Sequence, residues 1–426
     1  MSASTVTLLF ASALLASLLL RLWLATRQAR HVAQHRGAVP AAFDGIVTLA
    51  AHQRAADYTL DKLRFGLVTL AFGATVLLGW TLLGGLDALN GWLLAHARPW
   101  LGEFGTQLAL LGAFVAIGGL LELPLEAWST FRLEARHGFN RTTPAVWLAD
   151  QAKGVAVGLL LGAPIAALVL WLMGAAGGLW WLAAWGAWVG FNLLVLVLYP
   201  TVIAPLFNKF TPLEDGALKA RVEALMARCG FAAKGLFVMD GSRRSAHANA
   251  YFTGLGAAKR VVFFDTLLAK LTPAEVEAVL AHELGHFRHR HVTKRIAMMF
   301  ALSLAGLALL GWLSQQPGFY AGLGVTPSLD AQNDALALLL FGLAGPPFAF
   351  FVTPWFAGLS RRHEFEADAY ACAQTDAGDL RAALLKLYED NAATLTPDAL
   401  YARFYYSHPP AAERLAAMAT ARATAA

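Results

Sequence analysis

The sequence predicts a mostly α-helical protein that crosses a membrane several times. Apolar residues make up 58% of the 426 residues and charged residues 14%, whereas a soluble domain is about 45–50% apolar and about 25% charged. This balance excludes a disordered chain, a coiled coil and an ordinary cytosolic enzyme. One long stretch, from Pro205 to Arg290, lacks the apolar pattern and predicts a folded region outside the membrane.

Seven windows of about twenty apolar residues are long enough to cross the hydrocarbon of a bilayer as α-helices. They are Thr5–Ala25, Leu63–Leu86, Gly105–Trp128, Gly154–Gly174, Leu179–Ile203, Arg295–Leu313 and Ala335–Gly358. The first window lacks the basic start of a signal peptide, so we expect a retained anchor. We expect residues 1–204 to form a membrane domain with five spans, and residues 205–426 to form a second domain that includes the last two.

Positive charge gathers in alternate loops. The first, third and fifth loops and the segment after the seventh span are basic, whereas the second loop has one Arg and the sixth has no Lys or Arg. The positive-inside rule therefore places the long fifth loop and the C-terminus in the cytoplasm and the N-terminus outside.

The third predicted span contains charged residues, and others stand just before the fourth. Glu122 and Glu126 are four residues apart and share one face of the third span, while Asp150 and Lys153 precede the fourth. Charge within hydrocarbon costs about 3 kcal/mol or more. Two interpretations stay open: these side chains reach the interface or pair with each other, or they line a water-filled interior.

The long fifth loop predicts one amphipathic helix and a small sheet. The helix is Asp215–Cys229, and the strands are Gly235–Asp240, Ala248–Phe252 and Arg260–Phe264. Open strand edges are not tolerated in lipid, so the sheet lies outside the membrane. An exposed edge can bind an extended peptide as an added strand, and Asn249, Ala250 and Tyr251 are the candidates. A purely structural strand is the alternative.

The strongest chemical signal is a His-Glu-Leu-Gly-His motif on a predicted helix. The segment Thr272–Glu275 combines a capping threonine, a proline at the first position and a glutamate that completes a capping box. His282 and His286 lie four residues apart, so both imidazoles share one face and can hold Zn²⁺. Glu283 can take a proton from a water molecule that the metal activates.

A catalytic zinc site needs a third protein ligand. The candidates are His289, His291, His363 and Glu364. His289 lies near the face of the motif but one turn further on, and His291 faces elsewhere. Glu364 and Asp368 share a helix face, so one can bind the metal while the other orients a histidine. Glu366 is expected to be solvated, and the local pattern does not choose between Glu364 and His363.

Further stretches along the chain resemble the type I CaaX prenyl endopeptidases, integral-membrane zinc proteases of the a-factor and prelamin A processing type. They are His137–Asn140, Pro205–Phe210, Asp240–Ser245, Asn249–Gly254, Phe264–Leu268, the His282–His286 helix, Ser360–Asp368 and Tyr406–Pro410. The resemblance covers the chain from about residue 60 to the C-terminus, and the composition is typical of a bacterial source.

The resemblance implies a ring of seven helices around an aqueous chamber, with a gluzincin-like metalloprotease domain that contains the small sheet. It implies that Glu364 is the third ligand of one Zn²⁺ per chain, that Asp368 supports the site and that His408 lies near the substrate. His408 is then a candidate for stabilising the oxyanion. The alternative for His408 is a turn residue held by two prolines.

The expected function is hydrolysis of peptide bonds near the C-terminus of CaaX-type substrates, with or without a prenyl group. The expected location is a bacterial inner membrane, with the lipid bilayer and a peptide as partners and no nucleic acid. One alternative is a broad-specificity quality-control protease of the heat-shock type, and another is a non-enzymatic transporter or channel. Cys229 and Cys372 are expected to be reduced core residues.

Overall fold

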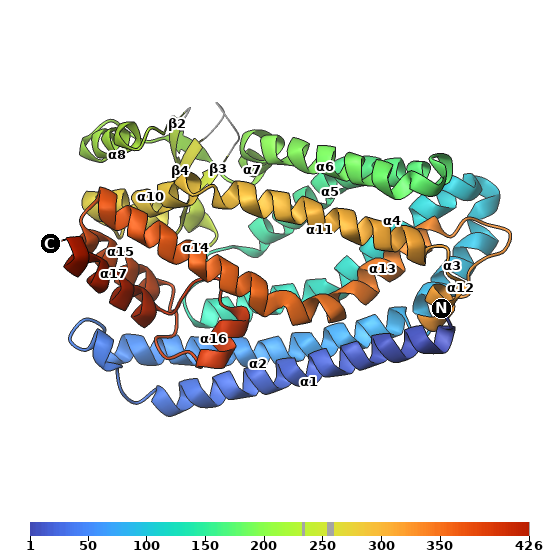
Figure 1. Ribbon diagram of the computed structural model, residues 1–426, viewed down its shortest axis with the longest axis horizontal. Helices are drawn as coiled ribbons and strands as arrows, with labels where there is room; N and C mark the ends of the chain where they lie inside the picture. Colours follow the sequence, from blue (N-terminus) through green and yellow to red (C-terminus); the bar gives the residue numbers. More distant parts are fainter. Residues whose placement is uncertain (232–234, 254–259, 426) are drawn as a thin grey trace.

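The computed structural model describes residues 1–231, 235–253 and 260–425 of an elongated, mostly helical molecule whose termini lie near opposite ends of its long axis (Figure 1). Within these residues, seven helical segments are long and apolar enough to cross a membrane. They are Ala3–His35, Leu49–Trp80, Arg98–Glu134, Pro144–Ala175, Gly177–Phe207, His291–Leu313 and Asp334–Gln374. Each overlaps one predicted span, which confirms the seven-span prediction.

Several spans are built from more than one element. The elements of the spans are α1 (Ala3–His35), α2 (Leu49–Trp80), α4 (Arg98–Trp128) with a π-helical turn (Ser129–Glu134), α5 (Pro144–Ala175), α6 (Trp180–Leu198), a second π-helical turn (Tyr199–Ile203), α7 (Ala204–Phe207), α11 (His291–Leu313), α13 (Asp334–Ala349) and α14 (Thr353–Gln374). The remaining α-helices are α3 (Gly85–His96), α8 (Ala217–Arg228), α9 (Asp265–Leu268), α10 (Pro273–Arg288), α12 (Pro317–Gly322), α15 (Ala377–Asp390), α16 (Ala399–Tyr405) and α17 (Ala411–Ala425).

One predicted boundary is wrong. The second span was expected to reach Leu86, but α2 ends at Trp80 because Thr81 leaves the helical conformation. Gly84 then adopts a left-handed φ of 77°, which a residue without a Cβ reaches at no steric cost. The apolar pattern continues through this turn into α3, and for this reason it does not reveal the break.

The spanning helices form the wall of a chamber. In the most apolar windows of α2, α4 and α5, only 6% of the residues are buried, whereas a helix in a solid bundle buries a whole face. Buried apolar side chains gather instead in two large clusters. One includes Phe10, Leu86, Leu110, Leu310 and Leu340, and the other includes Val222, Phe263, Leu280, Leu380 and Leu415. Outside these clusters, α1 and α2 border cavities.

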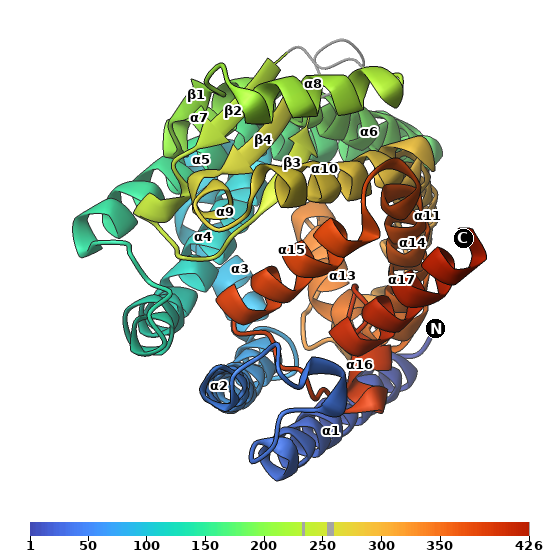
Figure 2. The same cartoon turned by 90° about the vertical axis from the view of Figure 1, so that its left-hand side faces the viewer.

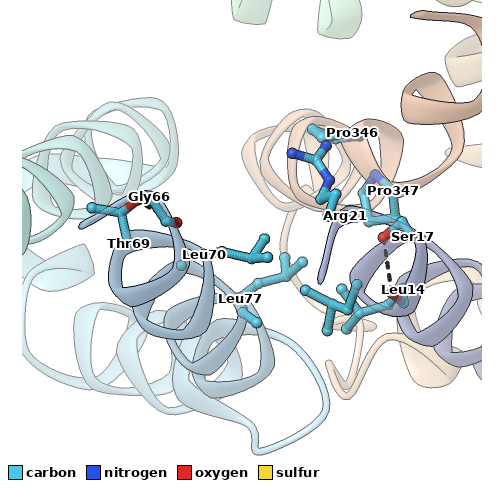
Figure 3. A pocket seen from close by; sticks show the side chains of 12 residues that line it. Leu14, Ser17, Arg21, Gly66, Thr69, Leu70, Leu77, Pro346 and Pro347 are labelled. Atoms are coloured by element: carbon cyan, nitrogen blue, oxygen red, sulfur yellow. Dashed lines mark hydrogen bonds between the residues drawn. The ribbon is translucent and has the colours of Figure 1, made fainter. Parts of the chain in front are cut away.

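A cavity of about 360 Å³ lies between α1, α2 and α13 (Figure 3). Leu70 and Leu77 point from α2 toward α1, and the guanidinium group of Arg21 lies near Pro346. A larger cavity of about 840 Å³ also includes Arg21 and Leu70, and it extends to α15 and to the loop before α17. The space between α1 and α2 is therefore continuous with the interior of the domain that follows the fifth span.

The small sheet confirms the three predicted strands and adds a fourth. Its members are β1 (Phe210–Pro212), β2 (Gly235–Met239), β3 (Ala250–Thr253) and β4 (Arg260–Phe264), in the order β1-β2-β4-β3. β2 and β4 are parallel, and the other two pairings are antiparallel. β3 is thus at one edge, as predicted. The last residue of the Asn249–Gly254 motif lies outside the described residues.

The two glutamates of the third span and the Asp and Lys before the fourth do not pair with each other. The guanidinium of Arg244 donates to both carboxylate oxygens of Asp150, at 2.8 and 3.0 Å. Lys153 donates to the carbonyl of Leu206 at 2.8 Å. The first contact joins α5 to the region that follows the fifth span, and the second joins α5 to the end of the fifth span. Among the other two, Glu126 accepts a hydrogen bond from Gln151 at 2.7 Å, and Glu122 is exposed.

Candidate metal centre

The helix that carries the His-Glu-Leu-Gly-His motif begins as predicted. The backbone N–H of Glu275 donates to the hydroxyl of Thr272, and the Glu275 carboxylate accepts from the backbone N–H of Thr272. This capping box satisfies two N–H groups at the start of α10. His282 and His286 lie in the last two turns of the same helix, which fixes their relative positions.

α14 lies directly against α10, and a glycine makes this contact possible (Figure 2). A Cβ atom at Gly285 would meet the backbone of Ala367 at 2.8 Å, which is closer than real Cβ contacts come. The glycine of the motif therefore allows the two helices to approach closely. The approach brings Glu364 of α14 to the two histidines of α10.

His282, His286 and Glu364 form a cluster that fits a zinc ion. Their candidate ligand atoms all lie within 4.8 Å of one another. Glu364 oxygens lie 3.5 Å from Nε2 of His282 and 3.3 Å from Nε2 of His286. Tetrahedral ligands at about 2.0–2.1 Å from zinc are about 3.4 Å apart. Oε2 of Glu364 is buried without a hydrogen-bond partner among the described residues, so a cation would satisfy it.

Negative charge around His282 also suits a cation. Burial lowers the pKa of His282, but the adjacent carboxylates of Asp368 and Glu364 outweigh burial and raise the pKa to about 9. Nδ1 of His282 lies 2.8 Å from Oδ1 of Asp368. With Nδ1 bonded to Asp368, the ring turns its Nε2 toward Glu364, at 3.5 Å.

Arg414, which holds Asp368 in place, was not among the residues predicted from the sequence. From α17, Arg414 donates to the two Asp368 oxygens at 2.8 and 2.6 Å, and its Nη1 lies 3.7 Å from Oε2 of Glu364. Its helical phase was a usable signal. Arg414 lies four residues before Met418, on a face that is otherwise buried and apolar, and a buried arginine needs an anionic partner.

Two expectations about nearby residues are wrong. His291 was expected to face away from the motif, but its Nδ1 lies 2.9 Å from Nδ1 of His286. Glu366 was expected to be solvated, but its Oε2 lies 2.9 Å from Nε2 of His291. The local helical phase failed because α10 ends at Arg288 and a new helix, α11, begins at His291.

The other candidate ligands lie outside the cluster. In the part of the chain that the structure describes, the only group of three metal-binding side chains within reach of each other is His282, His286 and Glu364. His289 caps the end of α10. His363 stacks on His291, with ring centroids 3.9 Å apart. Cys229 and Cys372 are free thiols and partly buried.

Two further groups border the cluster. Glu283 follows His282 on α10, and burial raises the pKa of its carboxyl group, as suits a general base at neutral pH. Nε2 of His408 lies 3.4 Å from Oε1 of Glu364, and the side chain is 61% exposed. His408 and Arg414 line the 840 Å³ cavity, and Asn249, next to β3, lines it as well. Ala250 and Tyr251 follow on the edge strand.

A polytopic helical chamber with a His-Glu-x-x-His helix and a glutamate on a second helix defines a membrane-embedded metalloendopeptidase. Comparison with known proteins gives the family. Residues 28–209 match the model described as CAAX prenyl protease N-terminal, five membrane helices, and residues 212–422 match peptidase family M48. The chain belongs to the CAAX prenyl protease 1 family.

The relatives match along nearly the whole chain. A CAAX prenyl protease 1 homolog of Oryza sativa is 33% identical and covers 91% of this chain and 92% of its own length. The Homo sapiens homolog is 31% identical, with coverages of 97% and 95%. The crystal structure of S. mikatae Ste24p superimposes with a TM-score of 0.89 at 29% identity, covering 97% of this chain and 98% of that one. The family and the fold are thereby confirmed, and the transporter and heat-shock alternatives are not favoured.

Proposed function

We propose that this protein hydrolyses peptide bonds near the C-terminus of CaaX-type substrates, using one zinc ion held by His282, His286 and Glu364. The observation that carries the proposal is the convergence of these three side chains around the buried, unpartnered oxygen of Glu364. When bound there, zinc would polarise the scissile carbonyl group and acidify water.

The chain's own groups supply the remaining functions. Glu283 takes a proton from the attacking water and delivers it to the leaving amine. His408, beside Glu364 and open to the cavity, donates a hydrogen bond to the oxygen of the scissile carbonyl as negative charge develops. Asp368 orients His282 through Nδ1.

The substrate binds extended along the outer edge of β3, beside Asn249, Ala250 and Tyr251. Asn249 supports this placement because it lines the same cavity as His408. The names of the relatives support CaaX peptides as substrates. We expect a prenyl group to increase the affinity of the peptide, because the cavity continues to the membrane-level space between α1 and α2.

Two substitutions separate catalysis from metal binding. Glu283→Gln should retain zinc and lose about 10²- to 10⁴-fold in turnover, the range of a general base. Glu364→Ala should instead lower the zinc content measured by metal analysis. The assay is cleavage of a C-terminal CaaX peptide, with and without a farnesyl group, before and after chelation and zinc re-addition. Wild-type turnover in Glu283→Gln, or a normal zinc content in Glu364→Ala, would contradict the assignment.

We further propose that the protein resides in a bacterial inner membrane, with the metal site and the C-terminus in the cytoplasm and the N-terminus outside. The basic odd-numbered loops support this orientation. We assign residues 1–204 to a membrane domain and residues 205–426 to the metallopeptidase domain, and the two family matches meet near this boundary. A reporter fused to the C-terminus should be active only in the cytoplasm. Activity outside would reverse the orientation.

A further inference from the structure

The two histidines of the metal cluster have different kinds of partner. His282 is bonded directly to the carboxylate of Asp368. His286 is bonded to another imidazole, because its Nδ1 lies 2.9 Å from Nδ1 of His291. The second nitrogen of His291 lies 2.9 Å from Oε2 of Glu366. Each histidine of the cluster is therefore linked to a carboxylate. Asp368 contacts His282 directly, whereas Glu366 reaches His286 through His291, an arrangement called the relay below.

Chemistry fixes the direction of this relay. A hydrogen bond between two ring nitrogens needs one donor and one acceptor. A neutral histidine that presents Nε2 to a metal keeps its proton on Nδ1. His286 is therefore the donor, and Nδ1 of His291 must be the bare acceptor. His291 then carries its proton on Nε2 and donates it to Glu366, which as a carboxylate only accepts.

The surroundings hold His291 in this geometry. Its side chain is 1% exposed, and its ring is stacked on that of His363 at 3.9 Å with an interplanar angle of 12°. The preceding residue, Arg290, has a left-handed backbone with φ of 56°. This conformation is uncommon outside glycine and strains the backbone of other residues. The turn at Arg290 separates α10 from α11 and thereby places the His291 ring next to that of His286.

We propose that Glu366 positions the metal ligand His286 through His291, by fixing the one tautomer of His291 that accepts a hydrogen bond from His286. This inference rests on the proposed function, because it assumes that Nε2 of His286 binds the metal. Without an acceptor at position 366, His291 is free to place its proton on Nδ1. Two N–H groups would then oppose each other across 2.9 Å, and His286 would turn away.

The test compares Glu366→Leu with Glu366→Gln in the full-length protein. Leucine removes the acceptor, whereas the glutamine side-chain oxygen can still accept from Nε2 of His291. We expect Glu366→Leu to raise the zinc dissociation constant about 10- to 100-fold, which is the usual effect of removing a group that orients a metal ligand through hydrogen bonds. Glu366→Gln should restore an affinity close to that of the wild type. Glu223→Leu, which removes an exposed carboxylate on α8, is the matched control.

A second pair of variants changes His291, the residue between His286 and Glu366. His291→Phe keeps a ring that can stack on His363 but offers no acceptor to His286. His291→Asn offers an amide oxygen in place of the ring nitrogen. We expect the phenylalanine variant to weaken zinc binding more than the asparagine variant. The visible absorption spectrum of the cobalt-substituted protein should shift in Glu366→Leu and His291→Phe, because the orientation of a ligand changes.

Zinc affinity is measured by competition with a chelator, so the result does not depend on turnover. A wild-type affinity and an unchanged cobalt spectrum in Glu366→Leu would overturn the relay alone. Failure of Glu366→Gln to restore binding would also overturn it, because the charge of Glu366 and not its role as an acceptor would then matter. A wild-type protein that binds no zinc would overturn both this inference and the proposed function.

Discussion

Replacing Arg414 with methionine should destabilise the protein, and more strongly without zinc than with it. Arg414 is 6% exposed and Asp368 is 3% exposed. The guanidinium binds both Asp368 oxygens and lies 3.7 Å from Glu364. Methionine fills much of the space of the aliphatic stem but carries no charge. Two buried carboxylates therefore lose the cation that they share.

The size of the effect follows from burial and distance. Removing one partner of a buried ion pair costs about 3–5 kcal/mol. Opposite charges about 4 Å apart attract by about 4 kcal/mol at an effective dielectric constant of 20, so the Glu364 contact alone has a comparable magnitude. We expect the free energy of unfolding to fall by about 3–5 kcal/mol in the presence of a chelator. Bound zinc would supply positive charge to the same carboxylates and reduce the loss.

Thermal unfolding of the detergent-solubilised protein, followed by tryptophan fluorescence, measures the effect with chelator and with zinc. The matched variant is the double substitution Arg414→Met with Asp368→Asn, which leaves no unpaired charge at position 368. It should melt above Arg414→Met in the chelator series. A wild-type melting temperature for Arg414→Met in chelator would refute the reasoning, and so would a double variant that melts below the single one.

Three further predictions concern other parts of the molecule. Thr272→Ala should lower the free energy of unfolding by about 1 kcal/mol, because it removes half of a capping box, and the melting temperature measures the loss. Burial raises the pKa of Glu275, but hydrogen bonds from Lys386 and Thr272 outweigh burial and lower the pKa below its usual value. Their stabilisation is therefore present above about pH 4.5 and disappears as the pH falls through the folded-state pKa. The difference in melting temperature between wild type and Lys386→Met should accordingly shrink on acidification, and a constant difference would contradict the assignment. Gly73 lines the cavity between α1 and α2, and no atom lies within 4 Å of a Cβ built on it. Gly73→Trp should lower kcat/KM for a farnesylated peptide more than for a short unmodified one, and equal losses would show that this space does not receive the apolar group.

The sequence predicted the helical part of the fold well because span length and apolar character are local properties. Each of the seven spans was placed, and the capping box at Thr272 was confirmed. β1 was missed because its three residues, Phe210–Pro212, are too few for a periodic pattern and include a proline. β1 is an edge strand, where a proline is tolerated.

Only the part of the candidate site that lies on a single helix could be predicted from the sequence pattern. The two histidines of α10 converge by helical spacing alone, and this part could be derived from the sequence. Glu364 comes from a helix about 80 residues away, so the choice between Glu364 and His363 needed either the family resemblance or the structure. The helical phase of Arg414 indicated that it is buried, but its contact with Asp368 depends on how α17 packs, and the position of His291 depends on the turn at Arg290. No local pattern encodes these two contacts.

The distribution of packing explains how a chain with so few buried residues in its spans can hold a metal site precisely positioned for chemistry. One apolar cluster closes the end of the molecule near the N-terminus, and the other lies beneath the sheet and α10. The second cluster includes Leu280 and Leu284, which flank His282 on the metal-binding helix. Rigidity is thus concentrated where ligands must be held to a fraction of an ångström, since protein interiors are close-packed and resist deformation. The helices between the clusters need only satisfy their own backbone hydrogen bonds, and this leaves their inner faces free to surround water and an incoming peptide.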